Sequence, residues 1–391
     1  MNISLTFYSV PLWFGFIQGW IYAVLLWNRS RQNGRLSDVL LGLVLVGTAF
    51  SIWEYMLGFS GISVLWEELE FFPRGFGLGF PPLFYFYLKS QTDSHFQFSR
   101  KDIRHFIPFV IHTVYHVSVF AMGSGFVQHW EKNVHYKYGI GNLEFCTGVI
   151  MQVYYFYHSL KLYRQYRVWI KTQFSDTEAV SLKWYRNFLI VLAIGLLADW
   201  LHILADVLLD LTFEQDWWDN LVTVFLIYYV SIAGYAQVPP ARNVVFKERR
   251  EETLPTETDV ETSVQEYGQW KVKIDRHIRD NQPYLQAELT LADVAQQLKT
   301  NTSVLSAIIN GVYKKNFNDF VNEYRVEEFK RQIQNPQNKH LTLLAVALDC
   351  GFNSKSTFNR AFKNATGTTP KEFLAQSIPK EPKPATAETT I

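Results

Sequence analysis

The chain has 391 residues, a formal net charge of +1 and two cysteines. This length predicts two or three domains, and two cysteines in different halves exclude a disulfide framework and a cysteine-based zinc site. The near-neutral charge averages two unlike parts: residues 1–240 carry long apolar, aromatic-rich runs, whereas residues 241–391 read as an ordinary polar segment.

Seven segments of the first part approach the roughly 20 apolar residues that cross a bilayer. The segment 72–89 is the least regular, because three glycines and two prolines would break or kink a helix there. A buried core helix is the alternative for any one segment, but seven in series favour a membrane domain. No basic stretch precedes the first segment, which predicts a retained span rather than a cleaved signal peptide. The predicted spans are 6–27, 37–59, 72–89, 104–123, 141–163, 187–210 and 217–237.

Basic residues alternate along the loops between these spans. The first, third and fifth loops and the residues after the last span are rich in Lys and Arg, whereas the N-terminus and the other loops together hold three. Because cytoplasmic loops carry an excess of Lys and Arg, the pattern places the N-terminus outside and the C-terminal half in the cytoplasm of a multi-pass inner-membrane protein. The basic residues of these three loops are Arg29, Arg31, Arg35, Lys89, Arg100, Lys101, Arg104, Lys161, Arg164, Arg167, Lys171, Lys183 and Arg186.

Polar residues inside the predicted spans are costly in a bilayer, so each is a candidate functional residue. The three in the sixth span recur at i, i+3 and i+7 on one helix face, and the two histidines of the fourth span are four apart. We expect them to line a polar cavity that opens outward and binds an unknown small-molecule or membrane signal. Hydrogen bonding between helices is an equal alternative, a metal site of His116, Asp199 and His202 is a further one, and no metal is assigned. The six residues are Glu54, His112, His116, Asp199, His202 and Asp206.

Two segments have the composition of connections. Residues 241–270 are acidic and Thr-rich and read as a solvated linker that becomes helical toward its end. Residues 379–391 form a polar tail that is predicted to be disordered. Between them lies a domain over residues 271–378, with 15 basic and 10 acidic residues.

This domain contains an internal repeat. The segment LTLADVAQQL (289–298) returns as LTLLAVALDC (341–350) at an offset of 52 residues. In each copy a Thr can cap a helix, apolar residues follow at i, i+3, i+4 and i+7, and a turn leads into a second amphipathic helix. Two helices joined by a tight turn, made twice, predict two helix-turn-helix units, connected by a long helix over 320–333. The second helices are expected to pack through Leu305, Ile308 and Ile309 in the first copy and through Phe358, Ala361, Phe362 and Ala365 in the second.

The second copy continues as GFNSKSTFNRAFKNATGTTPKEF. Gly351 is expected to supply the turn and Phe352 to pack in the core. The helix that starts near Ser354 has a polar face with three basic residues and no acid. Gly367 can end this helix in a left-handed conformation, and the sequence TPKE then predicts a capping box that starts another helix.

Over about 271–376 the sequence resembles the AraC/XylS-type transcription regulators. The second unit carries the specific pattern GF-x-S-x-x-x-F-x-R-x-F-K-x-x-x-G-x-x-P, and the first unit matches more loosely through D-V-A-x-x-L and nearby positions. Two departures, Ala307 and Gly311, fall on the first recognition helix and predict that sequence reading rests mainly on the second. The resemblance implies a DNA-binding domain over 271–378, in which each recognition helix enters a major groove of double-stranded DNA about 34 Å from the next.

The resemblance also assigns DNA contacts residue by residue. In the second unit Lys355, Ser356 and Arg360 would read base edges, and Asn359 and Lys363 would contact phosphates. In the first unit Ser303 and Ser306 match base-facing positions, and Thr302 could reach a phosphate. The alternative is that these polar faces are merely solvated.

The sequence therefore predicts an all-α protein: a seven-helix transmembrane sensor domain over 1–240, followed by a cytoplasmic double helix-turn-helix domain. Its expected function is that of a membrane-embedded one-component transcription regulator. No cofactor or catalytic motif is present, which disfavours an enzyme, and signal transfer is expected to act across the linker, with a homodimer as one option. The alternatives are a membrane transporter or enzyme with a regulatory tail, and a C-terminal domain that binds proteins instead of DNA.

Overall fold

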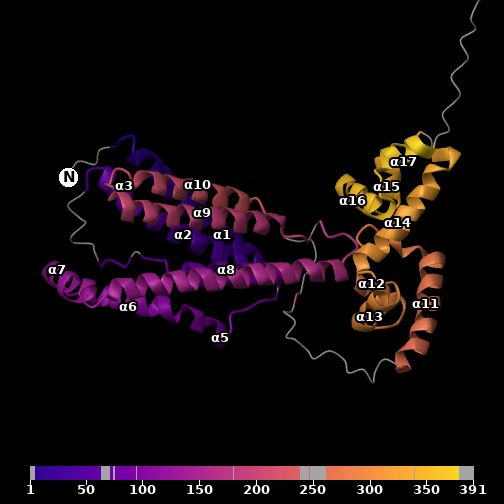
Figure 1. Ribbon diagram of the computed structural model, residues 1–391, viewed down its shortest axis with the longest axis horizontal. Helices are drawn as coiled ribbons and strands as arrows, with labels where there is room; N and C mark the ends of the chain where they lie inside the picture. The colour runs from indigo at the N-terminus through magenta and orange to yellow at the C-terminus, as the bar shows by residue number, and fades with distance from the viewer. Residues whose placement is uncertain are drawn as a thin grey trace, which may run out of the picture. The chain divides into compact units, whose positions relative to one another are not determined.

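The computed structural model describes residues 5–62, 71–73, 75–93, 95–178, 180–237, 246, 261–338 and 340–377, and in this part of the chain it contains helices and no strand. The chain divides into two units (Figure 1). The first comprises Met1–Tyr166 and Leu182–Glu248, and the second comprises Arg167–Ser181 and Arg249–Ile391. The predicted tail 379–391 and most of the predicted linker lie outside the described residues, and the end of that linker is helical in α11 (Glu261–Asn281).

The first unit, called the apolar unit below, is built from long apolar helices and several short ones. A 3-10 turn precedes α6, and a π-helical segment, Glu131–Tyr136, follows α7. The helices are α1 (Ser9–Asn33), α2 (Leu36–Ser51), α3 (Trp53–Phe59), α4 (Phe80–Thr92), α5 (Arg100–Ile103), α6 (Ile107–Phe120), α7 (Ser124–Trp130), α8 (Ile140–Gln173), α9 (Lys183–Leu209) and α10 (Trp217–Tyr235).

Three helical segments among the described residues are long and apolar enough to cross a membrane: α1, Leu36–Phe59 and α9. The seven-span count is therefore not confirmed. The third predicted span differs from expectation, because the glycine-rich stretch before Phe80 is not helical and α4 has only 13 residues. The fourth is also short, since α6 has 14 residues. The fifth lies within α8, which extends ten residues beyond it to Gln173.

Glycines let α1 approach its neighbours closely. A Cβ on Gly15 would lie 2.7 Å from a methyl carbon of Val224 in α10, and a Cβ on Gly19 would lie 3.1 Å from the Cβ of Ala49 in α2. Such small residues are typical of helix interfaces in membranes, where close backbone approach replaces the hydrophobic effect. The packed faces of α1, α2 and α10 form much of the interior of this unit.

The second unit contains the repeat. Its helices are α11, α12 (Leu291–Gln297), α13 (Thr302–Val312), α14 (Phe317–Ile333), α15 (Leu343–Asp349), α16 (Lys355–Thr366) and α17 (Pro370–Ser377). Helices α12 and α13 pack with α11 and the start of α14 around one apolar core, and α15 and α16 pack with the rest of α14 around another. The long connecting helix and both helix pairs lie where the repeat predicted them.

Candidate DNA-binding interface and apolar-unit cavity

The first helix-turn-helix unit is formed by α12 and α13. Thr290 caps α12 through a capping box with Asp293, and Asn301 caps α13 by accepting the Val304 N–H at 2.8 Å. The core-facing residues Leu305, Ile308 and Ile309 are buried, as predicted. Ser303 is exposed and Thr302 and Ser306 are half-buried, so the predicted contact positions lie on or beside the free face of α13.

The second helix-turn-helix unit depends on a sharp turn between α15 and α16. Gly351 has φ +90°, and a Cβ there would collide with the Tyr284 carbonyl oxygen and lie 2.9 Å from that of Leu285. Only glycine meets both conditions. Phe352 follows and is buried in the same core cluster as Phe329 and Phe358. The ring centroids of Phe352 and Phe358 lie 5.3 Å apart. The turn and the core position predicted from the sequence are both confirmed.

The recognition helix α16 is capped at both ends. The Ser354 hydroxyl accepts the Thr357 N–H at 3.2 Å, and Gly367 ends the helix at φ +78°. Thr369 and Glu372 then form the predicted capping box of α17, which lowers the pKa of the Glu372 carboxyl through its hydrogen bonds with Thr369. These caps fix the direction of α16 because they satisfy backbone groups that helix ends leave unpaired.

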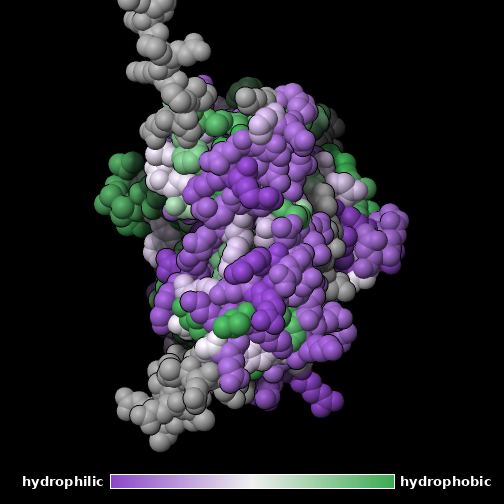
Figure 2. Space-filling view, turned by 90° about the vertical axis from the view of Figure 1, so that its right-hand side faces the viewer, coloured by the Kyte–Doolittle hydropathy of each residue, from purple (hydrophilic) through white to green (hydrophobic). Residues whose placement is uncertain are grey.

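The predicted base-reading and phosphate-contacting residues of α16 are all exposed. They are Lys355, Ser356, Asn359, Arg360 and Lys363. Their opposite face is buried through Thr357, Phe358 and Phe362. Ala365 was expected in the core and is exposed, because the core residues of α16 end at Phe362. Figure 2 views the side of the molecule on which Figure 1 draws α11 to α17, and this face is mostly hydrophilic.

Arg325 of α14 connects the two helix-turn-helix units. Its side chain is fully buried, its Nε donates to the Tyr284 carbonyl at 2.7 Å, and one terminal nitrogen donates to the Gln286 carbonyl at 2.8 Å. Burial lowers the pKa of the Arg325 guanidinium to about 10. Because Tyr284 also lies against the Gly351 turn, the Arg325 guanidinium connects the first helix-turn-helix unit, the long helix α14 and the second helix-turn-helix unit. The sequence contains no sign of this role of Arg325, because its partners are carbonyl groups about 40 residues away.

A segment that precedes α9 contacts this same junction. Ser175 is buried, its N–H donates to the Leu289 carbonyl at 3.0 Å, and its hydroxyl accepts from Arg325 at 3.1 Å. Asn318 of α14 donates to the Ser175 carbonyl at 2.6 Å. The segment therefore belongs to the second unit although both helices that flank it begin or end in the first.

Two carboxylates of this segment lie at the start of α16. Asn353 donates to Asp176 at 2.7 Å, and the hydroxyls of Ser354 and Ser356 donate to the two Glu178 carboxylate oxygens at 2.7 and 2.6 Å. A predicted base-reading residue, Ser356, is thus already hydrogen-bonded within the chain. No sequence signal pointed to these acids, which lie nearly 180 residues before their partners.

A family model described as a helix-turn-helix domain matches residues 294–376. This part of the chain is an AraC-type helix-turn-helix domain. The match covers most of the first helix-turn-helix unit and all of the second, including α16. The AraC-type domain identifies the C-terminal part as DNA-binding, and it says nothing of the apolar helices, which precede it. Neither the comparison with curated proteins nor the comparison with solved structures gives a match to this chain.

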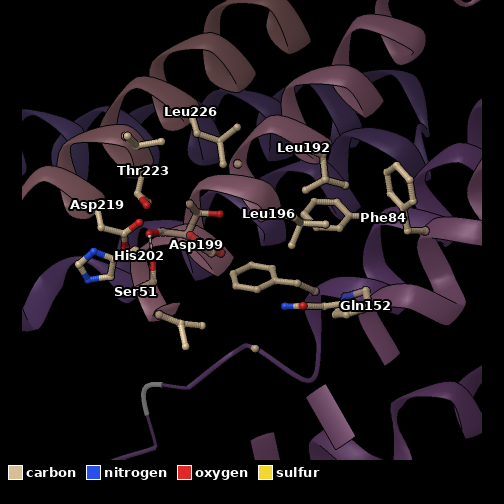
Figure 3. A pocket seen from close by; sticks show the side chains of 18 of the residues that line it. Ser51, Phe84, Gln152, Leu192, Leu196, Asp199, His202, Asp219, Thr223 and Leu226 are labelled. Atoms are coloured by element: carbon tan, nitrogen blue, oxygen red, sulfur yellow. Dashed lines mark hydrogen bonds between the residues drawn. The ribbon is translucent and has the colours of Figure 1, made fainter. Parts of the chain in front are cut away.

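The apolar unit contains a cavity of about 450 Å³ between α2, α4, α8, α9 and α10. Figure 3 shows its two ends: acidic and hydroxyl side chains gather around Asp199, and apolar side chains gather around Leu192. At the polar end the His202 Nε2 lies 3.1 Å from one Asp216 oxygen, and the Tyr55 hydroxyl donates to the other at 3.1 Å. The polar end is lined by Ser51, Tyr55, Asp199, His202, Asp216, Asp219 and Thr223.

The structure divides the six residues that were expected to share one cavity. Asp199 and His202 line the 450 Å³ cavity, together with two acids of the α9–α10 region that the prediction missed. His112 and His116 instead meet Glu144 of α8, and His112 lines a second cavity. Glu54 and Asp206 line neither cavity, and Asp206 is exposed. Helical spacing gives the face that residues share, but not the helix that this face meets.

Proposed function

We propose that this protein is a membrane-embedded one-component transcription regulator, in which the apolar unit senses a signal and the AraC-type domain binds promoter DNA. The observation that carries the proposal is α16: a doubly capped helix whose buried face is fixed by the core and whose free face exposes three cations and no acid. Base edges in the major groove are read by such side chains, with Arg to guanine the commonest specific pair.

The surface of the apolar helices supports embedding in a bilayer. Only 11% of the most apolar stretch of α9 is buried inside the protein, and α6 and α8 also expose large aliphatic side chains along their length. A soluble monomer rarely exposes apolar surface on this scale. The proposal retains seven spans, with the N-terminus outside and the AraC-type domain in the cytoplasm, because the basic loops alternate accordingly.

The mixed cavity of the apolar unit supports a sensing role. A pocket of several hundred Å³ with an apolar end and a few convergent polar groups is typical of small-molecule sites. Asp199, Asp216 and Asp219 supply negative charge at the polar end, and His202 supplies one imidazole. The signal would therefore be a small amphipathic molecule with a cationic or hydrogen-bond-donating head.

The test of the DNA-binding role uses the full chain in lipid nanodiscs. Binding to genomic DNA fragments is measured across a salt series for the wild type, Arg360→Ala and Lys371→Ala. Lys371 is an exposed cation on α17 that has no assigned contact, so its variant matches the loss of charge. We expect Arg360→Ala to weaken binding to preferred fragments by about 1–3 kcal/mol and to broaden specificity.

The control variant should lose only a salt-dependent, sequence-independent increment. If Arg360→Ala and Lys371→Ala behave alike, Arg360 does not read bases. If neither the wild type nor Glu178→Gln, which removes the carboxylate that is hydrogen-bonded to α16, prefers any fragment at any salt concentration, the AraC-type domain acts as a protein-interaction module, and the regulator proposal is wrong.

A further inference from the structure

Three side chains with metal-binding chemistry converge between α6 and α8. The His116 Nε2 lies 3.3 and 3.4 Å from the two carboxylate oxygens of Glu144, and the His112 Nε2 lies 3.8 Å from one of them. The two imidazole rings are stacked with centroids 4.1 Å apart, since they are four residues apart on one helix. One ligand atom from each residue can be chosen so that all lie within 4.8 Å of one another.

These separations suit a tetrahedral ion. Ligand bonds of about 2.0–2.2 Å place neighbouring ligand atoms on such an ion roughly 3.3–3.6 Å apart. The two His–Glu distances fall at or near this value before any ion draws them together. Two imidazoles and one carboxylate with a fourth position open are also the ligand set of many catalytic zinc sites, and imidazole favours zinc and its neighbours over calcium or magnesium.

A plain hydrogen bond explains only part of the cluster. It accounts for His116 and Glu144, but the second imidazole adds no good hydrogen bond, because 3.8 Å is too long for one. The His112 Nδ1 is buried and has no hydrogen-bond partner among the described residues. A metal ion would use both rings at once and neutralise the carboxylate, which is costly to leave charged in an apolar helix bundle.

The protein also leaves room beside the cluster. A second cavity, of about 290 Å³, borders His112 and Glu144 and shares Asp199 with the larger cavity. Gly75 faces the cluster from the stretch before α4, and a Cβ there would lie 3.3 Å from the His112 Cε1. The open coordination position would therefore face a cavity that can hold water or a ligand atom.

We propose that His112, His116 and Glu144 bind a divalent transition-metal ion of the zinc class, with one coordination position open to the adjoining cavity. In the proposed orientation the site lies toward the outer side, because α6 runs outward from a basic loop and Glu144 is near the start of α8. The metal would then be part of what the apolar unit detects.

The test measures Zn²⁺ binding to the metal-free full chain in detergent micelles by calorimetry, and Co²⁺ binding by its visible absorption. The variants are His116→Gln and Glu144→Gln, and the control is His158→Gln, which alters a histidine outside both cavities. His202→Gln tests the alternative that the ion binds in the larger cavity. We expect one ion per wild-type chain and a loss of affinity of more than roughly 100-fold in both cluster variants, beyond the loss typical of outer-shell changes.

His158→Gln should bind Zn²⁺ as the wild type does. The proposal is wrong if the wild type binds no stoichiometric ion, if the cluster variants keep their affinity, or if His202→Gln abolishes binding instead. Helical circular dichroism of each variant separates loss of a ligand from loss of the fold. On adding Zn²⁺ the melting temperature should rise in the wild type and in His158→Gln, but not in the cluster variants.

A different observation carries a second proposal, which rests on the proposed function. Glu178 accepts hydrogen bonds from Ser354 and Ser356 at the N-terminus of α16, and Asp176 accepts one from the neighbouring Asn353. Helix N-termini bind anions because their N–H groups and dipole favour negative charge. Phosphates of DNA use the same kind of site.

We infer that residues 174–178 restrain the recognition helix until a signal withdraws them. Glu178 occupies a position at which a DNA phosphate would be bound, and it uses the Ser356 hydroxyl that would face a base. Its negative charge would also repel the DNA backbone. The segment is continuous with α8 and α9, which carry the lining of both cavities, so a shift of either helix would reach it through the chain. This route replaces the linker as the expected path of the signal.

The test compares the full chain with Glu178→Gln and with Asp280→Asn, binding a preferred DNA fragment in nanodiscs. Asp280 is an exposed acid on α11, so the two variants each remove one negative charge from the same compact unit. We expect Glu178→Gln to bind roughly ten- to a hundred-fold more tightly, the factor that corresponds to one hydrogen bond to a charged group.

Hydrogen exchange at residues 174–178 provides a second measurement. Their protection should fall when the preferred fragment is added to the wild type. The inference is wrong if Glu178→Gln and Asp280→Asn bind alike, or if protection at 174–178 stays unchanged in the DNA complex. Failure of the regulator proposal looks different, because then no chain, wild type or variant, prefers any fragment.

Discussion

The turn at Gly351 gives the sharpest test of how the AraC-type domain is built. In Gly351→Ala the new Cβ must adopt φ +90°, a conformation that costs about 1–2 kcal/mol for a non-glycine residue. It must also displace the Tyr284 carbonyl, which accepts the buried Arg325 Nε at 2.7 Å. Losing that charge-assisted bond costs about 1.5–3 kcal/mol, so we expect a total of about 3–5 kcal/mol.

Two other glycines of the AraC-type domain separate the cost of backbone strain from the cost of the collision. Gly367 has φ +78° but no atom within 4 Å of an added Cβ, so Gly367→Ala should cost only the backbone strain of about 1–2 kcal/mol. Gly311 lies inside α13 with open space around it and no positive φ, so Gly311→Ala should stabilise its helix by about 0.5–1 kcal/mol.

Hydrogen exchange of the full chain in nanodiscs measures how each glycine substitution changes the free energy of opening of the second helix-turn-helix unit. A loss of about 3–5 kcal/mol corresponds to a fall in protection of roughly 10²- to 10⁴-fold in α15 and α16. If Gly351→Ala costs no more than Gly367→Ala, the Tyr284 carbonyl moves freely, and the role given to the buried Arg325 is refuted.

Three further predictions concern the second unit. Ser354→Ala should destabilise α16 by about 1 kcal/mol, the usual cost of an N-cap, and unchanged exchange of its first turn would contradict the cap. Hydrogen bonding with Arg331 lowers the pKa of the Glu328 carboxyl, so its contribution is present above the unfolded pKa and lost as pH falls through the lower folded one. Glu328→Gln should therefore flatten the acid side of the stability profile, and a profile that keeps the wild-type slope would contradict this. A disulfide between cysteines at Glu178 and Ser356 should block DNA binding until reductant is added, and binding that ignores the reductant would count against the restraint.

The helix-turn-helix pair could be predicted because local rules specify it. Caps, turn glycines and apolar periodicity act over a few residues, and in this domain they agree with one another. The structure places the helix bounds within about a residue of the predicted starts at Ser354 and Thr369. Ala365 was misplaced because periodicity shows which face of a helix is apolar, but not how far along the helix that face stays covered.

Contacts between distant segments could not be predicted in this way. Arg325 meets Ser175 across 150 residues, and Glu178 meets Ser356 across 178. Neither pair leaves a pattern in the sequence, since both depend on how separate helices pack. The same reason explains the cavity: helical spacing groups residues on one face of α6 or α9, but it does not show that His116 pairs with Glu144 and His202 with Asp216, or that Asp206 lines neither cavity.

In the proposed function one chain is embedded in a bilayer and binds specific DNA at the same time. This claim is tested most directly by crosslinking cells that express the full chain, isolating the membranes, and sequencing the DNA attached to the protein, with Arg360→Ala as the comparison. We expect the wild-type membranes to retain a small set of promoter fragments and the variant to lose them while remaining in the membrane. Membrane-bound protein with no enriched DNA, or enriched DNA recovered only with soluble protein, would contradict the account.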